Sequence, residues 1–120
     1  MTEEYKFQKL RVYQLALDYV DAIYALSVQL PDTERYNLKT QIERAATSIV
    51  LNIAEGSTGQ TDAEQSRFLG HSIRSYLETI ACIDLIIRRD YVDEISLKQT
   101  KKLGHELFVK LQAFRKSLRK

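Results

Sequence analysis

Apolar side chains recur at steps of three and four residues in four separate stretches of the chain, with short polar segments between them. This spacing gathers apolar groups on one face of an α-helix. It predicts an all-α protein in which short connections hold consecutive helices side by side as an antiparallel up-and-down four-helix bundle. The bundle is expected to be a single domain of residues 1–120, with helices at about residues 7–30, 34–55, 62–89 and 96–118.

The same spacing predicts the core residues of each helix. In the first helix they are Leu10, Tyr13, Leu17, Val20 and Tyr24. In the second they are Leu38, Ile42, Ala46, Ile49 and Ile53. In the third they are Leu69, Ile73, Tyr76, Ile80, Ile83 and Ile87. In the fourth they are Gly104, Leu107, Leu111, Phe114 and Leu118.

Residues that favour helix ends separate these stretches. Pro31 cannot continue the first helix. Either the carboxylate of Asp32 or the hydroxyl of Thr33 is suited to cap the start of the second helix. Gly56 is expected just beyond the end of the second helix. Two predicted capping boxes open the later helices, Thr61 with Glu64 and Ser96 with Gln99.

Composition excludes several classes of protein. With 44% hydrophobic and 28% charged residues the chain is expected to be globular, and no apolar run approaches the length of a transmembrane helix. The N-terminal stretch has mixed charge and no apolar signal-peptide core, so a cytoplasmic location is expected. Cys82 is the only cysteine and is interpreted as a small buried hydrophobic residue.

Positive charge is concentrated at the C-terminal end. Residues 96–120 carry eight basic side chains and one acidic side chain, a net charge of +7, whereas the other 95 residues have a net charge of −5. A basic terminal helix on an acidic body is typical of a protein that binds a polyanion. Charge pairing within the chain or between subunits would produce the same pattern, and the sequence leaves both interpretations open.

A polar stripe flanks the predicted core of the second helix. Gln41, Ala45, Ser48, Asn52 and Glu55 lie within about 40° of a common direction. The third helix carries a similar set, His71, Ser75, Glu78 and Cys82. Because the two helices are expected to be neighbours, we predict a hydrogen-bonded cluster of Asn52, Glu55 and Ser75 with Arg44, Arg74 or Gln41.

The residue pattern argues against an enzyme. The two histidines, His71 and His105, lie on different predicted helices, and the Glu-x-x-His pairs of di-metal bundle proteins are absent from the sequence. Ser48 has no strained turn around it, and the glycine loop after Gly56 lacks the Lys-Ser/Thr pair of a phosphate loop. We therefore predict no catalytic residue, no metal site and no cofactor.

Apolar residues also occur away from the predicted core. Val50, Leu51 and Ala54 fall on the outward side of the second helix, and Ala81, Leu85 and Ile86 lie off the main apolar stripe of the third. Helices that are apolar on more than one side are usually buried on more than one side. In a small bundle this predicts a homo-oligomer.

The segment from Gln41 to Gly56, "QIERAATSIVLNIAEG", resembles a family signature. The family is the bacterial four-helix-bundle proteins first noted as reading frames within intervening sequences of large-subunit ribosomal RNA genes, which once carried a ribosomal-protein label. The resemblance continues upstream in "FQKLRVYQLALDYVDAIY" and downstream at Phe68, Leu69, Ser75 and Glu78.

This resemblance implies an antiparallel four-helix bundle that assembles as a homopentameric ring. The chain also looks similar to the accessory variability proteins of diversity-generating retroelements, which bind nucleic acid through basic surfaces and engage a reverse transcriptase. The signature residues are expected to serve packing and assembly. They are Gln41, Arg44, Ser48, Asn52, Glu55, Gly56, Ser75 and Glu78.

Two functions from different classes follow. The first is a non-enzymatic oligomer that binds RNA or DNA electrostatically through the basic last helix. The second is a structural or protein-interaction adaptor, such as a partner of a polymerase or reverse transcriptase, that does not bind nucleic acid itself. The predicted nucleic-acid-binding residues are Lys98, Lys101, Lys102, Lys110, Arg115, Lys116, Arg119 and Lys120.

Overall fold

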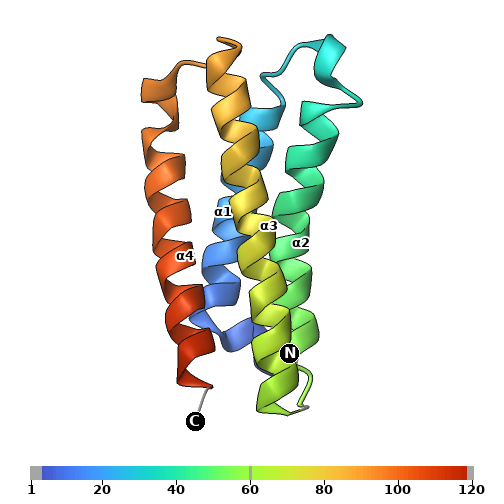
Figure 1. Ribbon diagram of the computed structural model, residues 1–120, viewed down its shortest axis with the longest axis vertical. Coiled ribbons are helices and arrows are strands. Elements are labelled where there is room, and N and C mark those ends of the chain that lie inside the picture. The colour runs from blue at the N-terminus through green and yellow to red at the C-terminus, as the bar shows by residue number, and fades with distance from the viewer. Residues whose placement is uncertain (1–3, 60, 119–120) are drawn as a thin grey trace.

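The computed structural model describes residues 4–59 and 61–118, and within them it contains helices and no strand. Its four α-helices are α1 (Arg11–Ser27), α2 (Leu38–Gly56), α3 (Asp62–Arg88) and α4 (Lys98–Ser117). Consecutive helices run in opposite directions, and α1 lies behind α3 between α2 and α4 (Figure 1). This confirms the predicted all-α four-helix bundle.

Helices α2 and α3 form the most extensive contact between helices, while α4 packs against both α1 and α3. A buried serine lies where α2 and α3 approach each other. Ser72, fully buried on α3, donates a 2.9 Å hydrogen bond from Oγ to the backbone carbonyl of Ile49 on α2. A short polar side chain therefore holds the two helices together where a larger residue would separate them.

The predicted core is confirmed for α2, where every residue of the apolar stripe is buried. On α3 and α4, the predicted residues are either buried or packed against the core. The prediction for the first helix was only partly right: Leu10, Tyr13 and Val20 pack against the core, but Leu17 and Tyr24 are exposed. The buried side of α1 is instead formed by Val12, Leu15, Ala16, Tyr19, Ile23, Leu26 and Ser27.

Several predicted helix ends also differ from the structure. The first helix does not begin at Phe7, because Lys6–Lys9 is a separate 3-10 turn and Leu10 is extended, with φ −71° and ψ 133°. It ends at Ser27, where the backbone amides of Gln29 and Leu30 bond to carbonyls three residues earlier.

The connections from α1 to α2 and from α3 to α4 each contain a short 3-10 helix, at Asp32–Glu34 and Glu94–Leu97. These turns delay the start of α2 to Leu38 and of α4 to Lys98. Neither Asp32 nor Thr33 caps α2, since the residue at that position is Asn37 and its side chain makes no capping bond. Asp93 accepts a hydrogen bond from the Ile95 amide and caps the second of these turns. The N-cap residue of α4 is Leu97, so Ser96 does not have the predicted role.

The start of α3 matches the prediction more closely. The Thr61 hydroxyl accepts a 3.1 Å hydrogen bond from the backbone amide of Glu64 and so caps the helix. Gly56, in contrast, is the last residue of α2 and does not lie beyond it. A Cβ at Gly56 would lie 2.7 Å from the Cβ of Phe68, so glycine is needed there because α3 packs so closely.

The two connections at the other end of the bundle are joined by a hydrogen bond. The Tyr91 hydroxyl, after α3, donates to Glu34 Oε2, before α2, at 2.7 Å. This bond, with one from Asn37, holds the pKa of the Glu34 carboxyl below its ordinary value. The connections therefore support each other although 57 residues separate the two side chains.

Candidate nucleic-acid interface

The basic residues of α4 do not share one face. Lys98, Lys102 and Lys116 lie within about 40° of one another around the helix and are exposed, and Lys116 also lines a groove between α4 and α3. Lys110 lies beside α1, where it lines a hollow with Leu10 and Arg11. Arg119 and Lys120 lie outside the described residues, so their predicted role stays a prediction.

Two ion pairs involve charged residues of α4. Lys101 lies 3.4 Å from Glu94 of the preceding turn, and Glu106 lies 3.7 Å from Arg11 of α1. Glu106 is the one acidic residue of residues 96–120, and it pairs with a residue of α1 and not with a lysine of its own helix. Within residues 4–59 and 61–118, no ion pair includes Lys98, Lys102, Lys110, Arg115 or Lys116. Pairing within the chain therefore leaves most of the positive charge of α4 uncompensated.

Arg115 occupies a different position from the lysines. It is half-buried and crosses from α4 to α3, where its Nε donates a 3.3 Å hydrogen bond to Ser66 Oγ. Sequence reasoning grouped Arg115 with the exposed lysines and did not select Ser66 or Gly70, which both contact it. The sequence did contain one signal for this contact, the isolated Gly70 inside a predicted helix. A glycine in such a position usually allows another group to pack closely against the helix.

The polar stripe of α2 does meet α3, through a smaller cluster than predicted. Ser75 Oγ donates to Ser48 Oγ at 2.9 Å, and Asn52 Nδ2 lies 2.9 Å from the Ser48 carbonyl oxygen and 3.0 Å from Ser48 Oγ. All three side chains are half-buried. The cluster joins two helices by hydrogen bonds among neutral groups.

The charged members of the predicted cluster lie apart from it. In the part of the chain that the structure describes, no hydrogen bond or ion pair joins Glu55, Arg44 or Arg74 to Ser48, Asn52 or Ser75. Gln41 bonds weakly to Asn37 instead, at 3.4 Å. Prediction of these partners failed because helical spacing gives only the direction of a side chain around its helix. Contact between side chains of two helices also depends on how far the helices are shifted along their axes.

A nucleophile needs a base within hydrogen-bond reach, and the partners of Ser48 are a serine and an asparagine. The His71 and Phe68 rings form a T-shaped pair, with ring centroids 5.9 Å apart. No group of three or more metal-binding side chains gathers among the residues described. Burial and the charge of Glu78 raise the pKa of the Cys82 thiol, so this buried group is neutral at physiological pH.

The family model described as "23S rRNA-intervening sequence protein" matches residues 8–113. The chain belongs to this family. The 23S rRNA-intervening sequence family match includes all of α1, α2 and α3 and most of α4. No curated protein matched the chain.

A solved structure has the same fold as this family member. It is a protein of unknown function from the S23 ribosomal protein family of Bacteroides thetaiotaomicron, 24% identical, with a TM-score of 0.80. The similarity covers 88% of this chain and 98% of that one. Among the described helices, none is long and apolar enough to cross a membrane.

Replacing Asn52 of this intervening-sequence family protein by leucine is expected to lower its free energy of unfolding by about 1 kcal/mol. The change removes both hydrogen bonds from Asn52 to Ser48 in a half-buried cluster. Thermal unfolding followed by circular dichroism measures the effect, which corresponds to a fall of about 4 °C in melting temperature.

Gln41→Leu is the matched control, because Gln41 lies on the same stripe but is exposed and makes only the long hydrogen bond to Asn37. Its melting temperature should stay within about 2 °C of the unmodified protein. Equal losses in the two variants would show that the Ser48–Asn52 bonds do not stabilise the fold.

Proposed function

We propose that this protein is a non-enzymatic oligomer that binds RNA or DNA through phosphate contacts of α4. The observation that carries the proposal is the uncompensated charge of that helix. Lys98, Lys102 and Lys116 are exposed, and no ion pair within the described residues neutralises them. Clustered lysines of this kind bind the nucleic-acid backbone independently of sequence and release its counterions.

Assembly would multiply this charge. Apolar side chains remain exposed on α1, just after its end and on α2, among them Tyr24, Val28 and Leu51. Leu51 is 61% exposed and Val28 is 72% exposed, so a monomer would leave considerable apolar surface in water. We propose that this surface contacts a second subunit, and that the oligomer is a homopentamer that carries one copy of α4 from each subunit.

The test is a filter-binding titration of a single-stranded RNA at several KCl concentrations. Changing Lys98, Lys102 and Lys116 together to glutamine should weaken retention and lower the slope of log affinity against log salt by about 2, since each phosphate contact contributes roughly 0.7. Changing the exposed Lys9, Arg35 and Arg44 to glutamine removes the same charge from other elements. This control should change the slope by less than about 0.5.

Retention that does not depend on salt, or equal losses in both triple variants, would contradict the proposal. The adaptor function predicts a different pattern. In that case the lysine variant loses assembly, measured by light scattering, because α4 would then pair with an acidic surface of another subunit or partner protein. The control variant would keep its assembly.

A further inference from the structure

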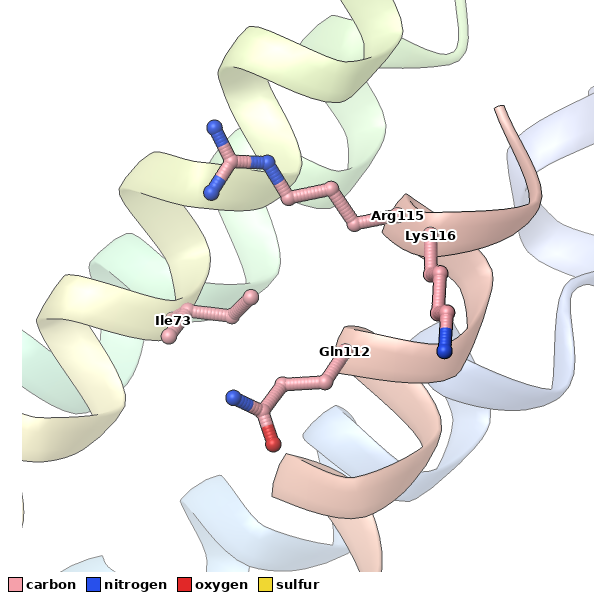
Figure 2. A pocket seen from close by; sticks show the side chains of 4 residues that line it. All are labelled: Ile73, Gln112, Arg115 and Lys116. Atoms are coloured by element: carbon pink, nitrogen blue, oxygen red, sulfur yellow. The ribbon is translucent and has the colours of Figure 1, made fainter. Parts of the chain in front are cut away.

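A groove of about 520 Å³ lies between α3 and α4, lined by Ile73, Gln112, Arg115 and Lys116. Figure 2 shows the Arg115 side chain crossing from α4 to α3 while the Gln112 amide projects into the space between the helices. Two cationic groups, one amide and one apolar side chain therefore meet at a single surface hollow. A volume of this size is within the range of small-molecule sites.

Gly70 leaves room for the Arg115 guanidinium against α3. A Cβ at Gly70 would lie 2.9 Å from both Cζ and Nη2 of Arg115 and 3.1 Å from Nη1. Three nearly equal distances mean that the flat face of the guanidinium covers the Gly70 backbone. Any larger residue at position 70 would displace the guanidinium, so a glycine in the middle of α3 is explained by this contact.

The guanidinium keeps donors available for a ligand. Its Nε bonds to Ser66, and in the described ranges no hydrogen bond or ion pair uses Nη1 or Nη2 of Arg115. An arginine that already uses one donor in a hydrogen bond loses less further freedom when its other N–H groups bind an oxyanion. Gln112 and Lys116 line the same groove and add an amide and an ammonium donor.

We infer that this groove is a phosphate-binding site in which Arg115 is the anchor. The inference rests on the proposed nucleic-acid binding and deepens it. One backbone phosphate of the strand contacts Nη1 and Nη2 of Arg115, with Lys116 and Gln112 at its other oxygens, and the adjoining sugar lies against Ile73. Guanidinium groups bind phosphate oxygens through two parallel N–H donors, which a lysine on the outer face of α4 does not provide.

Gly70→Ala is the most informative variant, because it keeps every charge of the protein. Alanine is the better helix former, and the atoms it displaces are at the far end of a flexible side chain, so the variant is expected to fold. Its affinity for a 12-nucleotide RNA, measured by fluorescence anisotropy, should fall about tenfold, the effect of losing one charged hydrogen-bond pair. Arg115→Gln should cause a similar loss, and Arg115→Lys an intermediate one.

Arg44→Gln is the charge control, since Arg44 is exposed on α2 and lies outside the groove. It should change RNA affinity by less than about twofold. If Gly70→Ala and Arg115→Gln bind like Arg44→Gln while the unmodified protein still shows salt-dependent binding, the groove is not the site. The proposed function of α4 would then stand without this inference.

Titration with inorganic phosphate separates the two sources of the phosphate group. In nuclear magnetic resonance spectra, phosphate should shift the Gly70 amide and Arg115 Nε signals, and Gly70→Ala should abolish the Arg115 shift. If phosphate shifts these signals but RNA does not bind, the groove binds a small phosphate compound and the proposed nucleic-acid function is wrong. If neither phosphate nor RNA shifts them, the inference itself is overturned.

Discussion

Replacing Tyr19 by alanine is expected to lower the free energy of unfolding by about 3–5 kcal/mol, the largest effect of any change considered. Tyr19 lies on α1 and is fully buried, and the centroid of its ring is 5.5 Å from the ring centroid of Tyr76 on α3. Its hydroxyl forms a 2.8 Å hydrogen bond with Thr79 Oγ1. Alanine would leave a cavity at the centre of the bundle and remove one of the two hydrogen bonds of the buried Thr79 hydroxyl, which would keep its bond to the Tyr76 carbonyl.

Tyr19→Phe separates these two contributions. The ring is retained and only the bond to Thr79 is lost, so the expected cost is about 1 kcal/mol. Urea unfolding followed by circular dichroism, at one fixed protein concentration because assembly adds stability, measures both variants. A loss below about 1 kcal/mol for Tyr19→Ala would show that the bundle repacks around the missing ring.

Gly104→Val is expected to lower the free energy of unfolding by about 3 kcal/mol, the upper part of the range for overpacking. Gly104 is buried on α4, and a Cβ there would lie 2.7 Å from Cε1 of Tyr19 and 3.0 Å from Cε1 of Tyr76. Both rings are held in the core, so they cannot move aside as an exposed side chain would. Valine adds two methyl groups beyond that Cβ.

Ala113→Val provides the control, because Ala113 is exposed on the same helix. It measures the cost of a β-branched residue in α4, expected to be about 0.5 kcal/mol. The comparison uses the same urea titration. Similar losses in the two variants would contradict the view that α4 is held against the two tyrosine rings at Gly104.

The fold could be predicted from the sequence because each helix carries its own apolar spacing. On α2 the pattern is unambiguous, and all of the predicted residues from Leu38 to Ile53 are buried. On α1 two apolar faces compete, one with Leu17 and Tyr24 and another with Leu15 and Tyr19. Local spacing cannot choose between them, because Tyr19 is selected by Thr79 and Gly104, far away in the sequence.

The candidate site was predictable only in part for the same reason. The excess of lysine and arginine after residue 96 can be counted in the sequence. The position of Arg115 cannot, since it depends on Ser66, 49 residues earlier, and on the missing side chain of Gly70. Likewise, the 3-10 turns before α2 and α4 have no periodic signal, so both helices begin later than predicted.

Helix α4 contributes only three buried residues, Gly104, Leu107 and Leu111, whereas each of the other helices contributes seven. Local opening requires the loss of buried contacts, so α4 is the part of the bundle that detaches most easily. Its amide hydrogens should exchange with solvent faster than those of α2 and α3. A ligand that bridges α3 and α4 would slow this exchange. Binding in the groove would therefore be measured as slower hydrogen exchange along the whole of α4.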